Sequence, residues 1–484
     1  MAPKKLTDYE RKRLDNIKRN AEVLASLKIH STLNDLSSSA KSQRAKTKSY
    51  KVSPKKKVKG ESPIVIRRSL RSRGIKPDEL TAGGLKDDYT ETPNKKAKTI
   101  GSSPNKKVKT VDLCRELGPI SMRDVYVGKE SEDRKFVETM LNVSKGSRDS
   151  GGDGLEGGCE RKEIKGLDTM SLEEGNVARV VPGRILSVRV FPSVDRRMVV
   201  VGNKFGNVGF WNVDCVDESD GIYVYQPHSS PVSGIVVQPF STFKMFTCCY
   251  DGFIRLMDVE KEMFDLAYSG ADSIYSIAQR ADDVNSLYFS EGRGELNIWD
   301  GRTGKPSSSW GLHETRINSI HFNACNTNMM ATSSSDGTAC IWDLRKVVAD
   351  KAEALNTVNH ERAVHAAYFS PSGSILATTS LDDSIKLLTG ANYENVSKIH
   401  HNNQTGRWIS SFKGIWGWDD SHVFIGNMKR GVDVISTAEK RCIDTLVSPE
   451  ITAIPCRFDV HPHKFGMLAG ATSGGQVYLW TSSC

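Results

Sequence analysis

The sequence predicts an all-β fold, a seven-bladed β-propeller with a long basic tail before it, and two observations lead to this prediction. A turn followed by an alternating apolar run recurs seven times between Ile185 and Trp480. A period in the forties with β-type alternation is typical of WD repeats, in which each unit forms one four-stranded blade. The runs end 42 to 48 residues apart, at Trp211, Met257, Trp299, Trp342, Leu388, Ser436 and Trp480.

The fourth repeat shows how each blade is expected to form. Residues 317–322, 329–333 and 338–342 alternate apolar and polar side chains and are predicted to be strands. Asp336-Gly337 between the last two strands supplies the positive φ of a tight hairpin turn. Trp342 is then expected to pack between blades.

Closure of the ring requires a strand from outside the seven repeats. Only four residues follow Trp480, too few for the outer strand of the last blade. We therefore expect residues 177–181, just before the first repeat, to supply that strand. Such a clasp would leave no open sheet edge between the two ends of the ring.

Composition divides the chain into a tail, residues 1–170, and a propeller, residues 171–484. The first 110 residues carry 29 Lys and Arg against 11 Asp and Glu, whereas all eight Trp lie at or beyond Trp211. A basic segment poor in apolar residues cannot bury a core, so the tail is expected to be mostly disordered. Its Gly-rich residues 146–158 are interpreted as a linker.

Two kinds of segment stand out within the tail. Residues 7–29 are predicted to form an amphipathic helix, capped by Thr7, that either docks on a partner or folds back on the propeller. Lysine clusters at 54–59, 94–98 and 105–109 indicate nuclear import, with a solvated basic tail as the alternative. The first cluster contains Lys55, Lys56, Lys57 and Lys59.

Several classes of function are not supported by the residues. The ten cysteines form no CxxC pair, so neither a metal site nor disulfides are expected, and the compartment is expected to be reducing. Neither a signal peptide nor an apolar run of membrane-spanning length is found, which favours a soluble intracellular protein. Without a nucleophile–base pair or a phosphate loop, we expect no enzyme, no cofactor and no small-molecule substrate.

Cations gather at the loops that the fold would place on one face. The loops leading into the first strands and the turns between second and third strands emerge together in this architecture. Five of the seven blades contribute a cation there, which predicts a surface for phosphates, although Arg–Asp pairing within blades remains the alternative. The candidates are Arg184, Lys204, Arg293, Arg316, Arg362, Arg407, Lys429 and Arg430.

The sixth blade has a longer lead-in loop, residues 400–408, which ends in Arg407-Trp408. An Arg-Trp pair at a loop tip can contact a phosphate and stack on a base. The alternative is that Trp408 begins a packed strand.

The opposite face carries two Trp-Asp-x-Arg sequences at the ends of the third strands of consecutive blades. They resemble the box by which WD-repeat substrate receptors bind the adaptor of cullin-4 ubiquitin ligases. The residues concerned are Trp299, Asp300, Arg302, Trp342, Asp343 and Arg345.

Three stretches give the chain a family resemblance: YERKRLDNIKRN at 9–20, VPGRI at 181–185, and NNQTGRW at 402–408 running on to GNMKR at 426–430. On these residues the chain resembles the WD repeat-containing protein 76 and Cmr family of nuclear WD-repeat propellers. The resemblance implies binding to DNA, with damaged DNA preferred, and a role with chromatin in genome maintenance.

A second resemblance concerns the blade-six loop. The chain is similar to the small subunit of the damaged-DNA-binding complex, which inserts a Phe-Gln-His wedge into the duplex. Aligned through KGIW at 413–416, that wedge would fall on Gly406, Arg407 and Trp408. The Phe position is Gly here, so the resemblance leaves only Trp408 to stack on a base.

The leading functional prediction is therefore a nuclear DNA-binding propeller of the DNA damage response. Two alternatives remain: a substrate receptor of a cullin-4 ubiquitin ligase, and a chromatin-associated scaffold that binds only proteins.

Overall fold

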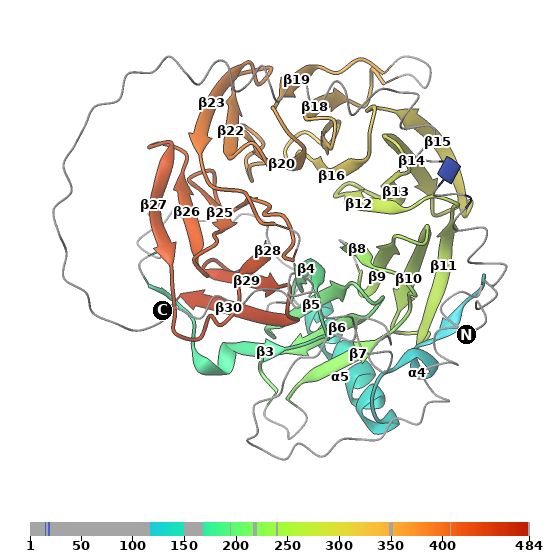
Figure 1. The fold of residues 1–484 in the computed structure, drawn as a ribbon. Coiled ribbons are helices and arrows are strands. Elements are labelled where there is room, and N and C mark those ends of the chain that lie inside the picture. Colours follow the sequence, from blue (N-terminus) through green and yellow to red (C-terminus); the bar gives the residue numbers. More distant parts are fainter. Residues whose placement is uncertain are drawn as a thin grey trace, which may run out of the picture. The chain divides into compact units, whose positions relative to one another are not determined.

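The computed structural model describes residues 117–149, 167, 169–193, 195–215, 220–238, 241–347, 352–406 and 408–482, together with Asp15, Lys18 and Arg19. From residue 117 on, these residues form seven antiparallel sheets that stand around a common centre as the blades of a propeller (Figure 1). The predicted seven-bladed β-propeller is confirmed.

The inner strands of each blade follow one another in the chain, with the first strand innermost (Figure 1). Blades one to three are β4 (Ile185–Val190), β5 (Met198–Asn203), β6 (Val208–Asn212) and β7 (Ile222–Tyr225); β8 (Val232–Gln238), β9 (Ser241–Cys249), β10 (Phe253–Asp258) and β11 (Met263–Ser269); β12 (Ile274–Arg280), β13 (Asp283–Glu291), β14 (Glu295–Asp300) and β15 (Lys305–Gly311). Blades four and five are β16 (Ile317–Phe322), β17 (Met329–Ser334), β18 (Thr338–Asp343) and β19 (Asn356–Asn359); β20 (Val364–Phe369), β21 (Leu376–Ser380), β22 (Ser384–Thr389) and β23 (Asn395–His400). Blade six is β24 (Ile415–Trp416), β25 (His422–Gly426), β26 (Val432–Ser436) and β27 (Arg441–Leu446), and blade seven contains β28 (Pro455–Val460), β29 (Met467–Thr472) and β30 (Gln476–Ser482).

The core lies between adjacent blades, where the alternating apolar residues meet. Trp342 is buried among residues of blades three and four, including Leu296, Trp310 and Met330. The turn before it also forms as predicted, since Gly337 has a φ of 91° and a Cβ there would lie 2.9 Å from the carbonyl oxygen of His360. The fourth repeat therefore folds as its sequence predicts.

The ring is closed by residues from before the first blade. β3 (Val177–Arg179) pairs antiparallel with β30, with Val177 opposite Tyr478 and Arg179 opposite Gln476. The predicted clasp is confirmed. A second strand, β2 (Met170–Ser171), pairs with the far end of β30, and a short 3₁₀ helix, η3 (Glu174–Asn176), lies between β2 and β3.

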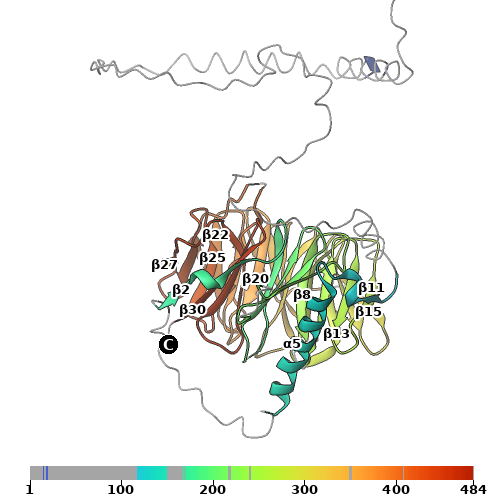
Figure 2. The ribbon, with the colours of Figure 1, turned by 90° about the horizontal axis from the view of Figure 1, so that it is seen from below.

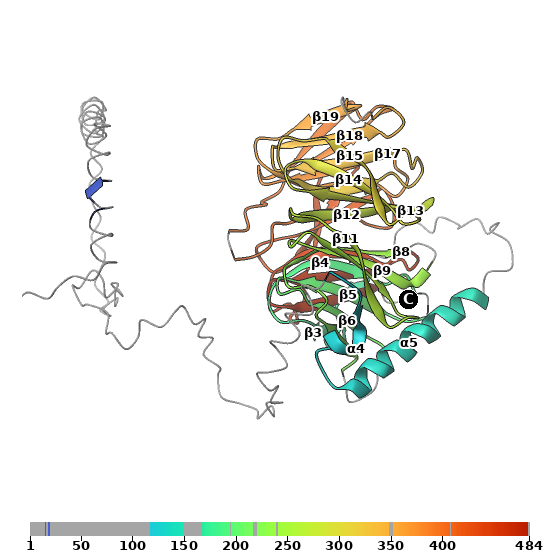
Figure 3. The same cartoon turned by 90° about the vertical axis from the view of Figure 1, so that its right-hand side faces the viewer.

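The structured region begins earlier than the sequence indicated, because residues 117–149 of the predicted tail are folded. They form β1 (Ile120–Ser121), α4 (Met122–Val125) and α5 (Glu130–Asp149). β1 adds to β11 of blade two, and α5 runs along the side of the ring (Figures 2 and 3).

An apolar stripe on α5 explains this difference. Phe136 is fully buried, with ring centroids 4.6 Å from Phe210 and 5.4 Å from Tyr225. The Tyr225 hydroxyl donates a 2.7 Å hydrogen bond to the buried Asp133. Averaging composition over the whole tail hid this short amphipathic helix, whose stripe has the spacing that packs on a core.

Other predictions for the tail concern residues that the structure does not describe. Of the predicted helix 7–29, only Asp15, Lys18 and Arg19 are described, and these three are helical and exposed. The import clusters lie outside the described residues, as does the predicted linker from residue 150 on; its first residues belong to α5. None of the helices described is long and apolar enough to span a membrane.

Candidate nucleic-acid interface

The fold brings the lead-in loops and the turns between second and third strands to the same end of the ring. In blade one, the Lys204 amide donates to the Arg184 carbonyl at 2.9 Å. In blade four, the Ser335 amide in the turn donates to the Arg316 carbonyl in the loop at 3.1 Å. We call this end the cationic face, after the predicted cations of its loops and turns: Arg184, Lys204, Arg293, Arg316, Arg362, Lys429 and Arg430.

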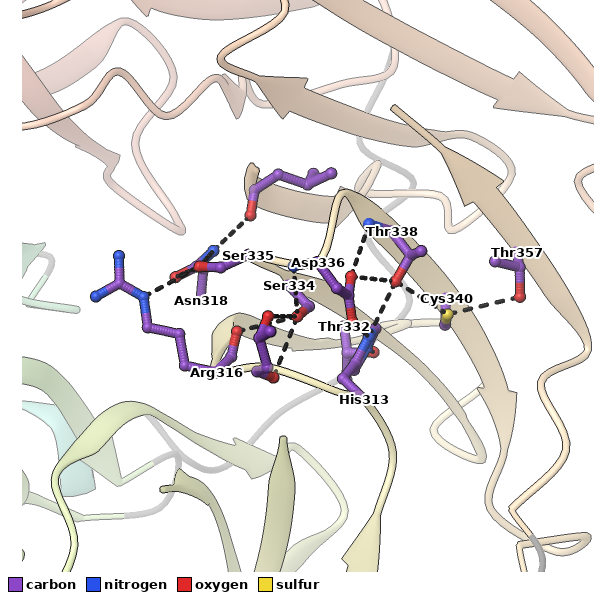
Figure 4. Close-up of polar contacts among 12 residues, drawn as sticks. His313, Arg316, Asn318, Thr332, Ser334, Ser335, Asp336, Thr338, Cys340 and Thr357 are labelled. Carbon is purple, nitrogen blue, oxygen red and sulfur yellow. Dashed lines mark hydrogen bonds and ion pairs between the residues drawn. The ribbon is translucent and has the colours of Figure 1, made fainter. Parts of the chain in front are cut away.

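Buried histidines fix the lead-in loops in place. In blade four, His313 Nε2 lies 2.7 Å from Thr332 Oγ1, and its Nδ1 lies 3.1 Å from Asp336 Oδ2 (Figure 4). Trp342 Nε1 donates to the same threonine hydroxyl at 2.8 Å, which joins the loop to the core. Burial lowers the pKa of His313 and outweighs the opposite effect of Asp336, so the imidazole stays neutral at pH 7.

The same arrangement recurs in other blades. His228 pairs with Thr247 at 2.8 Å in blade two, and His360 pairs with Thr378 at 2.9 Å in blade five. The lead-in loops of blades two, four and five are therefore held by neutral histidines, and Arg316 and Arg362 project from two of these loops.

Six cations of this face are not paired with a carboxylate among the described residues. Lys204, Arg293, Arg316, Arg362, Lys429 and Arg430 form no ion pair with any carboxylate in the part of the chain that the structure describes. Arg362 instead contacts the neutral Gln404 side chain at 3.5 Å. The alternative of Arg–Asp pairing within blades is therefore wrong for these six side chains.

The blade-six loop reaches across to other blades before β24 begins. Arg184 Nη2 donates to the Trp408 carbonyl at 2.7 Å, and the Ser410 amide donates to Ser473 in blade seven at 3.2 Å. The Trp408 side chain is 88% exposed. The alternative that Trp408 begins a packed strand is thus wrong, because the strand starts at Ile415. Arg407 lies outside the described residues.

Exposed aromatic rings add to this face, and sequence reasoning missed them. Phe205, 47% exposed, lies under Lys204 with Nζ 4.6 Å from the ring centroid. In blades two and three, the rings of Tyr250 and Tyr275 meet edge to face at 5.4 Å. Arg316 then covers Tyr275 at 5.3 Å. The signal available in the sequence was an aromatic residue beside the turn glycine, as in Phe205-Gly206.

On the opposite face, the arginine of each Trp-Asp-x-Arg sequence pairs with the aspartate two residues before it. Arg345 donates to Asp343 through its amide at 3.1 Å and through Nε and Nη2 at 2.9 Å. The Arg302–Asp300 pair repeats the pattern at 2.9 to 3.3 Å. The hydrogen bonds from Arg345 lower the pKa of Asp343, so this pair is fully ionised at pH 7. Trp299 and Trp342 are buried, whereas Arg345 is exposed.

Comparisons with known proteins agree with this architecture. The model of the WD domain, G-beta repeat, matches residues 220–258, 304–343 and 353–388. WD repeat-containing protein 76 of Xenopus laevis is 29% identical over 98% of this chain and 80% of its own length. The DNA damage-binding protein cmr1 of Aspergillus oryzae is 27% identical over 99% of this chain and all of its own length, and that of Neurospora crassa is 29% identical over the same shares.

The chain is a WD-repeat protein related to these proteins. The resemblance seen in the sequence to the WD repeat-containing protein 76 and Cmr family is confirmed. The names of these relatives refer to WD repeats or to the binding of DNA damage. No such name describes an enzymatic activity.

Two of the stretches that carry the family resemblance contact each other in the fold. Arg184, from the stretch at 181–185, donates to the carbonyl of Trp408, the end of the stretch at 402–408. The latter stretch runs on to 426–430, which supplies Lys429 and Arg430 in the turn of blade six. The propeller residues by which the chain resembles this family thus lie on the cationic face, whereas the stretch at 9–20 belongs to the tail.

Among the residues described, no group of three or more His, Cys, Asp or Glu side chains is placed to hold a metal ion.

Proposed function

We propose that this chain is a nuclear DNA-binding WD-repeat protein that acts in the response to DNA damage and contacts DNA through its cationic face. The observation that carries the proposal is the presence, on one rigid face, of cations without carboxylate partners beside exposed aromatic rings. Unpaired Lys and Arg gain counterion-release free energy on phosphates, and exposed rings stack on bases. The names of the relatives support the same role.

The geometry gives the two kinds of group separate tasks. The cations of blades one, three, four, five and six follow the rim and would position a duplex through its backbone, without regard to sequence. Trp408 projects from the loop that leads from blade five into blade six and contacts Arg184 of blade one, so it would take an unstacked base. Preference for damaged DNA then follows because a lesion or mismatch lowers the cost of unstacking.

The proposal includes further parts. Localisation to the nucleus would depend on the lysine clusters of the tail, including Lys55, Lys56, Lys57 and Lys59. The partners would be DNA and chromatin proteins, with neither a membrane nor a small-molecule substrate. The protein would act by binding and not as an enzyme.

Trp408→Ala in the full chain tests the proposal most simply. We expect binding to mismatched or lesion-containing duplex to weaken by about 1–3 kcal/mol, with a smaller loss on intact duplex. The melting temperature should stay unchanged because the side chain is exposed. Fluorescence titrations on both duplexes, with thermal melting of the same samples, give these quantities.

Phe465→Ala is the matched control for this experiment. Phe465 is an exposed aromatic residue, but it lies in the loop between β28 and β29, on the opposite face. The Phe465→Ala substitution should leave DNA affinity unchanged. Equal affinity of Trp408→Ala and the wild type on damaged duplex would remove the blade-six loop from the DNA-binding surface.

A second candidate function, as substrate receptor of a cullin-4 ubiquitin ligase, is favoured by the exposed Arg345 guanidinium on the opposite face. Arg345→Ala removes this group, leaves the buried Asp343 with the amide hydrogen bond of residue 345 alone, and should abolish capture of the ligase adaptor while DNA affinity is kept. Lys305→Ala, which changes another exposed cation of the same face, should have no effect on capture. Adaptor capture by the Arg345→Ala protein at the wild-type level would count against this function.

A further inference from the structure

A second group of cations lies at the centre of the ring, on or beside the innermost strands. It consists of Arg189 on β4, Arg316 before β16, Lys413 before β24 and Arg457 on β28, and we call it the central cluster. The side chains cross between blades: Lys413 of blade six donates to the Asn318 carbonyl of blade four at 3.1 Å, and Arg457 of blade seven donates to the Leu186 carbonyl of blade one at 2.9 Å.

One carboxylate accompanies these four cations among the described residues. Asp459 pairs with Arg189 at 3.1 Å and also accepts a hydrogen bond from the Val190 amide at 2.7 Å. Lys413, Arg316 and Arg457 have no described carboxylate partner. The cluster therefore keeps an excess of positive charge in a partly desolvated place, where like charges repel strongly.

The electrostatic consequences appear on the groups themselves. Burial, followed by the charges of Arg457, Arg189 and Arg316, lowers the pKa of Lys413 far below its usual value. Burial and the charges of Lys413, Arg457 and Arg316 lower the pKa of His365 to about 3. His365 is consequently neutral at pH 7. A nearby anion would stabilise the charged forms of Lys413, Arg457 and Arg316.

Two polar groups at this place have hydrogen-bonding capacity that the described residues do not use. His365 is 9% exposed, and its Nε2 has no hydrogen-bond partner in the described part of the structure. The Lys413 ammonium has three donors, of which the contact with Asn318 uses one. Buried donors without acceptors are costly, so an acceptor beside Lys413 would be stabilising, and His365 would donate to it in the tautomer that carries the proton on Nε2.

We propose that the central cluster is a binding site for one phosphate group of a small soluble molecule, held by Lys413, His365 and the guanidinium groups around them. A phosphate carries up to two negative charges and several acceptor oxygens, which match the excess charge and the unused donors. The Arg189 side chain is 46% exposed, so the cluster is open to solvent at this residue. The site shares Arg316 with the rim that is proposed to contact DNA, whereas Lys413, His365, Arg189 and Arg457 are not among the cations of that rim.

Lys413→Met tests the proposal in the full-length protein with inorganic phosphate as the probe. We expect phosphate to raise the melting temperature of the wild type more than chloride does at equal ionic strength. In the absence of phosphate the variant should melt at a higher temperature than the wild type, because repulsion is relieved. Its phosphate affinity by isothermal titration calorimetry should be about tenfold lower, the loss of one charge-assisted hydrogen bond.

Asp459→Asn provides a second variant with the opposite expected sign. It removes the one carboxylate beside the cluster while it keeps the size of the side chain, so phosphate should bind more tightly than to the wild type. DNA affinity at fixed ionic strength should be unchanged in Lys413→Met, which separates this proposal from the DNA-binding one.

Two results would overturn the phosphate site. One is a Lys413→Met protein that melts at a lower temperature than the wild type but whose melting temperature phosphate raises by as much as that of the wild type. Lys413 would then be only a structural link to Asn318. The other is an Asp459→Asn protein with unchanged or weaker phosphate binding. The second result decides the question even if Lys413→Met does not fold.

Discussion

On the cationic face, Arg293 and Arg362 have no described carboxylate partner, whereas on the opposite face Arg302 and Arg345 are each held by the aspartate two residues before them. The residue type is the same, but the local charge balance differs. A guanidinium already paired with a carboxylate gains less from a phosphate than one that is not. The comparison teaches that the positions of the acids, and not the count of arginines, distinguish a surface suited to DNA from one suited to a protein partner.

The anchoring of the two faces differs as well. Buried neutral histidines hold the lead-in loops of the cationic face, whereas ionised Asp–Arg pairs close the turns of the opposite face. A fall in pH is therefore expected to destabilise the histidine-anchored loops of the cationic face before the Asp–Arg turns of the opposite face.

The largest expected effect is a loss of stability in mild acid that begins at the cationic face. Burial lowers the pKa of His228 to about 3 and also lowers those of His313 and His360 below the ordinary value of 6.5. The unfolded chain then binds more protons below pH 6.5, so the stabilisation is complete above that pH and is lost as the pH falls. Each histidine contributes a slope of up to about 1.4 kcal/mol per pH unit.

Hydrogen exchange between pH 7 and pH 5, corrected for the intrinsic rate, measures this effect by region. Amides of the lead-in loops should lose protection first, while those of the turn at Asp343 to Arg345 keep it, because the pKa of Asp343 lies below this range. Stability that does not change across the range, or protection lost first on the opposite face, would contradict the assignment of the histidines as neutral anchors.

A smaller effect is expected from Phe205→Ala. Phe205 is half exposed and covered by Lys204, so it offers less free surface than Trp408. We expect single-stranded DNA to bind more weakly by about 0.5–1 kcal/mol, the range of an exposed cation–π contact. Titration of a short oligonucleotide measures the change. A loss as large as that of Trp408→Ala would show that the aromatic contacts extend around the rim.

Much of the fold could be predicted because strand alternation and repeat spacing are local signals. The clasp of residues 177–181 followed from counting the residues left after Trp480, and β3 confirms it. The packing of α5 was missed because Phe136 is buried only through its contacts with Phe210 and Tyr225, which are far away in the sequence.

The candidate site was less predictable. Topology alone placed the cations of the lead-in loops and turns on one face, and the exposure of Trp408 was left open. The central cluster escaped notice because Arg189, Lys413 and Arg457 lie on or next to strands of different blades and meet only when the ring closes. Whether an arginine is paired with an acid also depends on side-chain geometry, which the pattern of a repeat does not contain.

The salt dependence of DNA binding in two matched triple variants tests the central claim most directly. Arg293→Gln, Arg362→Gln and Lys429→Gln together change the cationic face, and Arg302→Gln, Lys305→Gln and Arg345→Gln together change the opposite face by the same net charge, with the basic tail intact in both. The account predicts that the first set lowers the slope of log affinity against log salt by roughly three, about one per lost phosphate contact, while the second set leaves it unchanged. Equal slopes in the two triple variants would contradict it.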